Sequence, residues 1–248
     1  MGILNITPDS FADGGKFNSF DSAVKHAREM VAEEADIIDI GGESTRPGAD
    51  RVSEEEEISR VIPVITELAK DGVRMSIDTM RASTARAAIQ AGAQIINDVS
   101  GGLADPEMLT TAAQLKVPFI AMHWRGQSKD MNSMANYDDV VKDVISELQE
   151  RISAALDAGI TKDNLIIDPG IGFAKTANQN WEIINQIHEF VALGYPVLIG
   201  ASRKRFLGEL TPDERESASV ALTSRLSTSG IWAVRVHSVK PHKDVLRA

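Results

Sequence analysis

Short runs of Val, Ile and Leu recur along the chain, and each is followed by Gly or a polar cluster and then by a longer segment with helical periodicity. These runs predict strands that begin near residues 2, 36, 74, 95, 118, 165, 196 and 233. Every interval between them leaves room for a helix. Because a parallel neighbour is reached only through a crossover connection, this alternation predicts a parallel sheet.

Three of the intervening helices have recognisable boundaries. Ser53 precedes an acidic run at residues 54–57 and stands at capping-box spacing from Glu56, and apolar residues then follow at helical spacing. Residues 137–156 and 180–193 show the pattern of two further amphipathic helices. We interpret the acidic run as the solvated start of a helix rather than as a binding site.

Eight strand and helix units in 248 residues predict a closed (β/α)8 TIM barrel. An open doubly wound sheet is the competing α/β architecture. Against it, the pattern Gly170, Gly172 and Lys175 lacks the third glycine of a dinucleotide fingerprint and follows a late strand. No Pro/Ser-rich linker or break in composition marks a boundary, so we expect one domain over residues 1–248.

Composition excludes several classes of function. Cysteine is absent, which removes disulfides, thiolate metal sites and cysteine nucleophiles. With 26 Lys plus Arg against 36 Asp plus Glu, the net charge of −10 disfavours binding to nucleic acid or anionic membrane. No apolar run approaches the roughly 20 residues that span a bilayer, and the first residues do not resemble a signal peptide. We therefore expect a cytoplasmic protein with small-molecule partners.

Polar residues follow almost every predicted strand, although a strand buried on both faces should be apolar. In chain order they are Asn5 and Thr7, Asp39 and Glu43, Asp78 and Thr79, Asn97 and Asp98, His123, Asp168, Ser202 to Lys204, and Arg235 and His237. In a parallel barrel the carboxyl ends of the strands meet on one face, where catalysis takes place. A single Asp there more often caps a helix, so the set as a whole predicts the site.

Cationic side chains gather on the last two strands. Lys204, Arg235 and His237 could hold a phosphate or diphosphate there, at the usual phosphate position of such barrels. Asn5 with a diphosphate oxygen could complete a Mg²⁺ shell, because Mg²⁺ commonly relies on few protein ligands plus substrate phosphates. A diphosphate held in this way is a leaving group.

Acids and amides come from earlier strands and from the sixth. Asp78, Asn97 and Asp168 could pair with a ring that offers several N–H donors, because a carboxylate accepts and an amide does both. His123 lies at a strand end, but no second ligand accompanies it at metal spacing. Three other histidines fall in helical or terminal segments and are interpreted as surface residues: His26, His188 and His242.

Seven motifs, in order and over essentially the whole chain, carry a resemblance to a known family. They are GILNITPDSF at 2–11, IDIGGESTRPG at 38–48, SIDT at 76–79, INDVSGG at 96–102, DPGIGF at 168–173, GASRKRFLG at 200–208 and RVH at 235–237. Together they resemble the dihydropteroate synthases of folate biosynthesis.

The resemblance implies a (β/α)8 transferase that joins p-aminobenzoate to 6-hydroxymethyl-7,8-dihydropterin diphosphate and releases diphosphate with the help of Mg²⁺. In this family the C–O bond breaks largely before attack, and the arylamine nitrogen captures a pterin-stabilised cation. Sulfonamides compete for the p-aminobenzoate pocket of the family, and a homodimer is expected.

The resemblance also implies roles for individual residues. The pterin contacts would be Asp78, Asn97, Asp168 and Lys204, with Met122 lining the pocket. The p-aminobenzoate pocket would contain Phe173, Ser202 and Lys204. Asn5 would bind Mg²⁺, while Arg235 and His237 would hold the diphosphate, with Thr45 on the same side. Two mobile loops that close over the site would carry Phe11, Asp13, Arg46 and Pro47.

The chain departs from the family pattern at its ends and at two internal positions. It begins at the first barrel strand and ends soon after the last helix starts, so we expect a barrel trimmed at both ends. Ser238 stands where the family usually has Asp, which is expected to alter the support of His237, and Ala174 stands where Gly usually follows Phe173.

Three alternatives stay open. A pterin-binding methyltransferase domain has a similar fold and similar acids, but it needs no diphosphate clamp. A Schiff-base aldolase would use Lys204 as its nucleophile. An inactive paralogue would bind pterin without turnover, although the intact Asn5, Asp78 and Asp168 argue against such decay.

Overall fold

The computed structural model describes residues 1–6, 15–43, 51–126, 131–209 and 211–247. Its strands are β1 (Gly2–Asn5), β2 (Ile38–Gly41), β3 (Met75–Asp78), β4 (Ile95–Asp98), β5 (Phe119–Met122), β6 (Leu165–Asp168), β7 (Leu198–Ile199) and β8 (Ala233–Val234). Its α-helices are α1 (Gly15–Ala32), α2 (Glu54–Lys70), α3 (Ala82–Ala91), α4 (Met108–Leu115), α5 (Val140–Asp157), α6 (Ala177–Asn185), α7 (Ile187–Val191), α8 (Pro212–Leu226) and α9 (Val239–Arg247).

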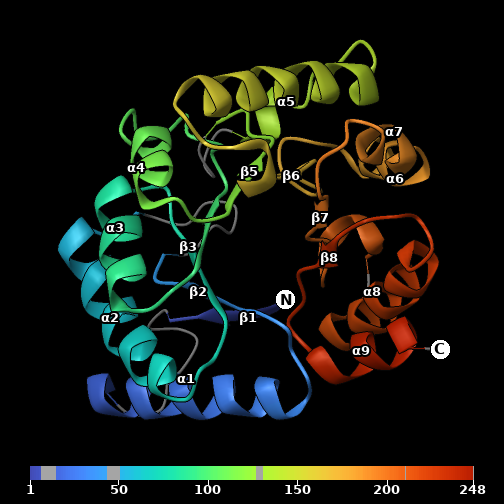
Figure 1. The fold of residues 1–248 in the computed structure, drawn as a ribbon. Coiled ribbons are helices and arrows are strands. Elements are labelled where there is room, and N and C mark those ends of the chain that lie inside the picture. Colours follow the sequence, from blue (N-terminus) through green and yellow to red (C-terminus); the bar gives the residue numbers. More distant parts are fainter. Residues whose placement is uncertain (7–14, 44–50, 127–130, 210, 248) are drawn as a thin grey trace.

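The strands form a closed parallel barrel. Strands β1 to β6 pair in sequential order, and β7 pairs with β8. Parallel bridges between Ile167 and Val197 and between Gly2 and Val236 join these two sheets at both edges. Figure 1 looks into the resulting ring of strands, with the helices arranged around its outside. The predicted (β/α)8 barrel is therefore confirmed, and the open doubly wound sheet is not.

Two of the three predicted helices match the structure closely. Helix α2 begins directly after Ser53, whose hydroxyl accepts a hydrogen bond from the backbone N–H of Glu56 at 3.2 Å. Helix α5 begins at Val140 after the N-cap residue Asp139, slightly later than predicted. The single helix predicted over 180–193 is wrong. The chain leaves helical geometry at Gln186, where φ is −114° and ψ is 28°, and so forms the separate helices α6 and α7.

Apolar and polar residues divide the interior of the barrel into two parts. Ile95, Ile120 and Ile166 belong to a small buried cluster that is separate from the larger core between strands and helices. Because side chains alternate along a strand, the residues two positions further on point to the same inner side. These residues are Asn97, Met122 and Asp168. The apolar cluster therefore fills one half of the interior and leaves the carboxyl-end half to polar groups.

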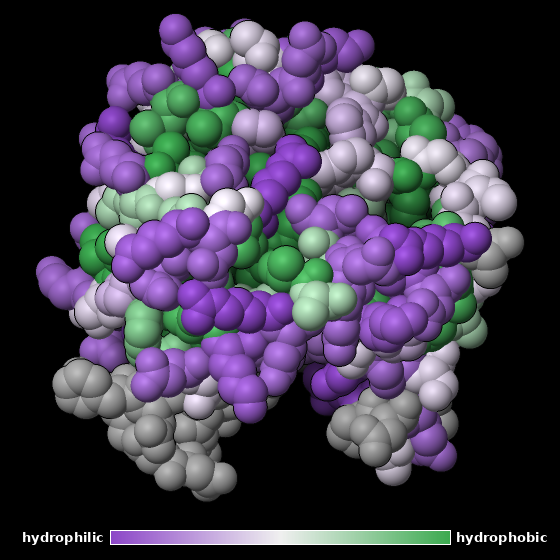
Figure 2. All heavy atoms as spheres, turned by 60° about the horizontal axis from the view of Figure 1, so that its bottom comes forward, coloured by the Kyte–Doolittle hydropathy of each residue, from purple (hydrophilic) through white to green (hydrophobic). Residues whose placement is uncertain are grey.

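The outer surface seen in Figure 2 is covered mostly by hydrophilic side chains, with hydrophobic atoms showing between them. This matches the division of the helices into a polar outer face and an apolar inner face. Among the described residues, no helix combines the length and the apolar character needed to cross a membrane.

Candidate active site at the carboxyl ends of the strands

The parallel register brings three polar residues and a glycine from four neighbouring strands into one row. Asn5 pairs with Gly41, Gly41 with Asp78, and Asp78 with Asn97. A Cβ atom on Gly41 would lie 3.5 Å from the Cβ of Asp78 and 3.7 Å from Oδ1 of Asn5. Glycine at this position therefore keeps the space between these two side chains clear. The register confirms that Asn5, Asp78 and Asn97 lie in one row at the same end of the barrel, with Gly41 between the first two.

Arg235, which directly follows β8, reaches across to two of the buried carboxylates. Its Nε donates to Oδ2 of Asp39 at 2.5 Å, and its Nη2 donates to Oδ2 of Asp78 at 2.6 Å. Burial would lower the pKa of Arg235, but the two carboxylates outweigh it and raise this pKa above its usual value. Burial raises the pKa of Asp78, and Arg235 opposes that rise. The guanidinium thus neutralises a pair of acids that would otherwise repel each other.

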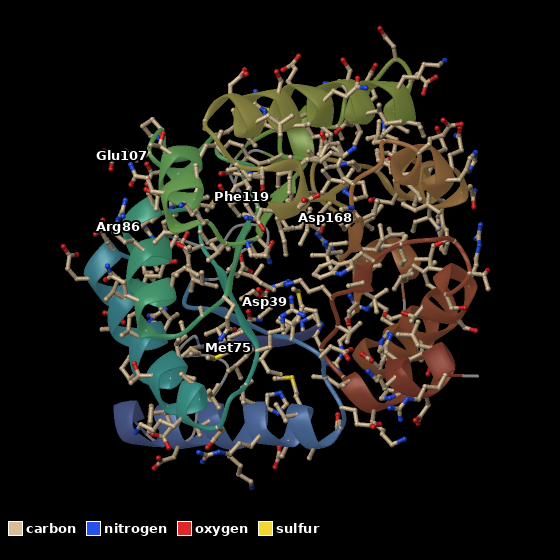
Figure 3. All side chains as sticks on the ribbon, in the orientation of Figure 1. Asp39, Met75, Arg86, Glu107, Phe119 and Asp168 are labelled. Carbon is tan, nitrogen blue, oxygen red and sulfur yellow. The ribbon has the colours of Figure 1, made fainter. Side chains whose placement is uncertain are left out.

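Asp39 joins this cluster; the sequence analysis counted it among the polar strand-end residues but assigned it no individual role. It is fully buried on β2, and its carboxylate accepts hydrogen bonds from the Ser76 hydroxyl at 2.5 Å and from the Asn97 amide at 3.1 Å. Figure 3 labels Asp39 and Asp168, which both lie within the ring of strands. The available signal was a carboxylate in the middle of an apolar, buried strand.

Asp168 and Lys204 meet around the loop that follows β6. The Asp168 carboxylate accepts the backbone N–H of Gly170 at 2.7 Å, and burial raises its pKa. Lys204 donates to the carbonyl of Ile171, and its Nζ lies 4.3 Å from the centre of the Phe173 ring. Burial lowers the pKa of Lys204 to about 7, and Asp168 partly opposes this. The structure therefore brings together the predicted pair of Lys204 and Phe173.

Met122 is buried at the end of β5 and is the register partner of Asp168. Ser202 is also buried, and its Oγ lies 3.0 Å from Nδ1 of His237. The same oxygen accepts the backbone N–H of His237 at 3.2 Å. The hydroxyl of Ser238, in contrast, accepts a hydrogen bond from Arg203 at 2.7 Å. Ser202 is therefore within hydrogen-bond distance of the His237 ring, whereas the Ser238 hydroxyl is hydrogen-bonded to Arg203.

The interpretation of His242 as a surface residue is wrong. This histidine is buried, with Nδ1 2.7 Å from the Thr223 hydroxyl and Nε2 3.2 Å from the Glu216 carboxylate. It lies on α9, and both partners lie on α8, so it joins these two helices. The helical periodicity of this short terminal segment did not show which face of helix α9 would pack against α8. His188 is exposed, as expected.

Several residues of the expected site lie outside the described residues, and the structure says nothing of their placement. They are Thr7, Phe11 and Asp13 on the first loop and Thr45, Arg46 and Pro47 on the second.

A Mg²⁺ ion fits the donor set of this site. Within the described parts of the chain, no three His, Asp or Glu side chains form a metal-binding cluster. Asn5 offers a half-buried amide oxygen beside the open position at Gly41. Mg²⁺ often keeps waters and takes its remaining ligands from substrate phosphates, so a single protein oxygen beside open space suits it.

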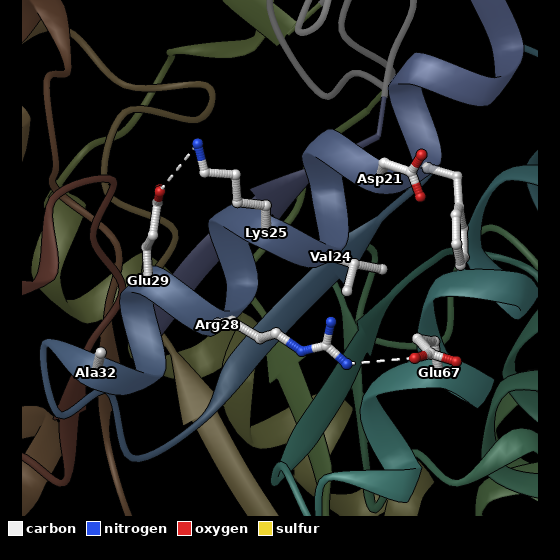
Figure 4. A pocket seen from close by; sticks show the side chains of 8 residues that line it. Asp21, Val24, Lys25, Arg28, Glu29, Ala32 and Glu67 are labelled. Atoms are coloured by element: carbon white, nitrogen blue, oxygen red, sulfur yellow. Dashed lines mark hydrogen bonds and ion pairs between the residues drawn. The ribbon is translucent and has the colours of Figure 1, made fainter.

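A groove of about 450 Å³ lies far from these residues, on the outside of the barrel between α1 and α2 (Figure 4). Its charged side chains pair with one another, as in the contacts of Arg28 with Glu67 at 3.2 Å and of Lys25 with Glu29 at 3.8 Å. Such paired, solvated groups make a weak binding site. The candidate active site is therefore the group of polar residues at the carboxyl ends of the strands.

Comparisons with known proteins agree with this geometry. The family model described as "Pterin binding enzyme" matches residues 1–237. The fold and the site thus define a pterin-binding enzyme built on a TIM barrel.

Individual relatives give a narrower result. The dihydropteroate synthase of Mycobacterium leprae is 48% identical to this chain over an alignment of 257 residues. The alignment covers 100% of this chain and 90% of that protein. That of Bacillus subtilis is 50% identical over 244 residues, covering 97% of this chain and 83% of the relative. The chain therefore belongs to the dihydropteroate synthase family. Its activity is dihydropteroate synthase activity, and it is a transferase of folate biosynthesis.

Solved structures show the same fold. A dihydropteroate synthase of Xanthomonas albilineans with 4-aminobenzoic acid has a TM-score of 0.93 and 44% identity, and the match covers 99% of this chain and 89% of that one. A complex from the same organism with 7,8-dihydropteroate has a TM-score of 0.89 and 41% identity, covering 99% and 90% of the two chains.

Proposed function

We propose that this chain joins p-aminobenzoate to 6-hydroxymethyl-7,8-dihydropterin diphosphate at the carboxyl ends of its strands, and that it releases diphosphate. The observation that carries the proposal is that hydrogen-bond acceptors and cations face each other in one barrel mouth. Asp78 and Asp168 supply acceptors on β3 and β6, while Lys204 and Arg235 follow β7 and β8. The ligands named for the Xanthomonas albilineans enzyme support the same substrates and product.

Asp78, Asn97 and Asp168 hold the pterin in this proposal, with Met122 lining the pocket. An ionised carboxylate accepts hydrogen bonds and donates none, so it suits the several N–H groups of a pterin edge. Asp78 and Asp168 are poorly solvated in the free protein because they are buried, and this raises the pKa of both carboxyls. A ligand that donates N–H bonds, or that develops positive charge, relieves this condition.

The arylamine binds against Phe173, with Ser202 and Lys204 beside it. The ring of Phe173 offers an aromatic face, and the ammonium of Lys204 lies above it. An ammonium in this position can also pair with the carboxylate of p-aminobenzoate. Lys204 thus stands between the two substrates, close to Asp168 on the pterin side.

Arg235 and His237 hold the diphosphate, with Thr45 on the same side. In the free protein Arg235 is bonded to Asp39 and Asp78. Binding of the whole substrate therefore exchanges partners: the pterin N–H groups replace the guanidinium at Asp78, and the diphosphate replaces Asp78 at the guanidinium. Asn5 would hold Mg²⁺, which supplies positive charge at the diphosphate oxygens when it is bound.

The chain accelerates the reaction chiefly by stabilising charge where it forms. As the bond from carbon to the diphosphate oxygen breaks, positive charge develops on the pterin next to Asp78 and Asp168. Negative charge develops on the leaving diphosphate next to Arg235 and His237. Groups fixed in a buried site before the reaction need little rearrangement in the transition state. The arylamine nitrogen then forms the new bond to carbon and releases a proton to solvent.

The resemblance to the family supports four further parts of the proposal. Residues 1–248 form one pterin-binding barrel domain, the chain assembles as a homodimer, and it works in the cytoplasm. The loops that carry Phe11, Asp13, Arg46 and Pro47 close over the bound substrates. Sedimentation of the purified protein tests the dimer directly.

Turnover with defined substrates tests the function. The protein is incubated with the dihydropterin diphosphate, p-aminobenzoate and Mg²⁺, and both diphosphate release and dihydropteroate formation are followed. We expect both products in equal amounts, and we expect a sulfonamide to raise the apparent KM for p-aminobenzoate. Folded protein that makes no dihydropteroate would refute the proposal. Pterin binding without turnover would instead identify an inactive pterin-binding protein.

A further inference from the structure

Lys175 is half-buried behind the loop that follows β6, on the side away from the proposed substrates. Its Nζ lies 3.0 Å from Nδ1 of His123, and it donates to the carbonyls of Gly170 at 3.1 Å and Phe173 at 3.0 Å. An ammonium group has three donors and no acceptor, so these three partners satisfy it completely. The sequence analysis used Lys175 only to argue against a dinucleotide fingerprint.

The partners of His123 determine which nitrogen of its ring carries the proton. Burial lowers the pKa of Lys175 to about 7, and Asp168 opposes this. In its ammonium form Lys175 can only donate, so Nδ1 of His123 accepts. Nε2 then carries the hydrogen and donates to Glu147 at 2.9 Å. Burial, helped by Lys175, lowers the pKa of His123 to about 4, so the ring is neutral near pH 7. An ammonium, a neutral imidazole and a carboxylate therefore stand in sequence from the loop outward.

Glu147 is held in turn by Arg125. The guanidinium Nε of Arg125 donates to both carboxylate oxygens of Glu147, at 3.1 and 3.0 Å. Burial would raise the pKa of Glu147, but the hydrogen bonds from His123 and Arg125 outweigh it and lower this pKa to about 2. The network thus ends in the ion pair between Arg125 and Glu147, which lies on α5 outside the barrel.

The loop between Asp168 and Lys175 has a backbone conformation that needs support. Gly170, Gly172 and Ala174 all have positive φ, at 69°, 80° and 48°. A Cβ atom on Gly170 would lie 2.4 Å from the carbonyl oxygen of His123, and one on Gly172 would lie 2.5 Å from Cδ of Lys204. The loop is therefore packed closely between the site and the network of Lys175, His123 and Glu147, and Ala174 stays there in a conformation unfavourable for a residue with a side chain.

The opposite side of this loop forms part of the proposed site. The backbone N–H of Gly170 donates to Asp168, the carbonyl of Ile171 accepts from Lys204, and the ring of Phe173 lies under the Lys204 ammonium. Lys175 contacts the carbonyls of two of these same loop residues from behind. A shift of the loop would therefore move the Phe173 ring and the acceptor of Lys204 together.

We propose that Lys175, oriented by His123 and Glu147, is a positioning residue that fixes the 170–174 loop and thereby shapes the arylamine half of the site. Lys175 acts through Phe173 and Lys204 and does not touch substrate. The inference rests on the proposed function, because it assigns the arylamine to that side of the loop. Asp168 depends on the loop less, since it ends a barrel strand and its carbonyl accepts the backbone N–H of His123.

The test compares Lys175→Met with Lys142→Met. The first variant keeps side-chain length but leaves the carbonyls of Gly170 and Phe173 without their donor. The second removes a lysine that is 83% exposed on α5. We expect Lys175→Met to raise the KM for p-aminobenzoate roughly tenfold or more, the size of a lost charged hydrogen bond. The equilibrium dissociation constant for 6-hydroxymethylpterin should change less than threefold, and Lys142→Met should behave as wild type.

If Lys175→Met does not fold, a second variant tests the same inference. Glu147→Gln keeps the acceptor for His123 at the outer end of the network but removes its charge. We expect it to raise the KM for p-aminobenzoate by about threefold, again with little effect on pterin binding.

Three outcomes would overturn the inference. The first is an unchanged KM for p-aminobenzoate in folded Lys175→Met. The second is an equal loss of affinity for pterin and for arylamine in the same variant, because this would indicate a merely structural role. The third, if only Glu147→Gln folds, is an unchanged KM in that variant. Wild-type protein that forms no dihydropteroate would instead refute the proposed function, and the inference would fall with it.

Discussion

Replacing Arg235 by Met should destabilise the protein far more than replacing an arginine with equivalent partners on the surface. The guanidinium of Arg235 bonds to Asp39 and Asp78, which are both buried. Its removal leaves two carboxylates close together without a counter-charge. Asp39 keeps its hydrogen bonds from Ser76 and Asn97, but these are neutral donors.

The size of the effect follows from the burial of the cluster. Breaking a buried ion pair by removing one partner costs about 3–5 kcal/mol, because the remaining charge is left in a poorly solvating environment. For a chain of 248 residues, each kcal/mol lowers the midpoint of thermal unfolding by about 2–4 °C. We therefore expect Arg235→Met to unfold about 6–20 °C below wild type at pH 8.

Arg28 provides the matched control. It also pairs with two carboxylates, those of Glu67 and Asp71 at 3.2 and 2.7 Å, but its side chain is 49% exposed. Water solvates the carboxylates that Arg28→Met leaves behind, so this variant should unfold close to wild type. Thermal unfolding of both variants, followed by circular dichroism at pH 5 and pH 8, measures the difference.

The pH dependence gives the same reasoning a second test. Without Arg235, which opposes the rise that burial causes, the pKa of Asp78 in the folded state should rise further above that in the unfolded chain. Folded Arg235→Met then binds protons more readily than its unfolded form, so its deficit should shrink as the pH falls from 8 to 5. Equal midpoints for Arg235→Met and Arg28→Met at pH 8, or a deficit that grows at pH 5, would refute this account of the cluster.

Three further predictions concern single residues of the site and its surroundings. Asp168→Asn should weaken the binding of 6-hydroxymethylpterin tenfold or more, measured by calorimetry, because a charged acceptor becomes neutral; an unchanged affinity would remove Asp168 from the pterin contacts. Ala174→Gly should leave the free energy of unfolding unchanged or raise it by up to about 1 kcal/mol in urea titrations, because φ is 48° at this position; a clear loss, as in a helix, would contradict the assigned conformation. Burial raises the pKa of Asp98 from 3.8 to about 6, so the free energy of unfolding of wild type should fall relative to Asp98→Asn as the pH rises from about 4 to 6; a constant difference would contradict it.

The barrel could be predicted from the sequence because its signals are local and repeated. Each apolar run is short, each is followed by a helical segment, and the parallel arrangement follows from the alternation. The break at Gln186 could not be predicted in this way, because hydrophobic periodicity continues across it. A local signal was nevertheless present, since Thr176 and Gln179 form a capping box that places the start of α6 earlier than the predicted helix.

Candidate site residues were predictable where a polar group interrupts an apolar strand. Asn5, Asp78 and Asn97 were found in this way, and the register confirms that they lie in one row. The same signal marked Asp39, but nothing in the sequence says whether a polar group at a strand end faces a ligand or another side chain. In the structure, Asp39 bonds to Arg235, which is 196 residues away along the chain.

Residues that act through the backbone of a loop are the hardest to find from sequence. Lys175 was visible as a lysine after a glycine-rich run, a pattern that is common and has many uses. Its meaning depends on His123, which is 52 positions away and is brought to it by the pairing of β5 with β6. Because that pairing also sets Met122 beside Asp168, one strand contact aligns the pterin pocket and the support of the arylamine loop. Substitutions behind this loop should therefore alter arylamine binding without touching any residue that the motifs identify.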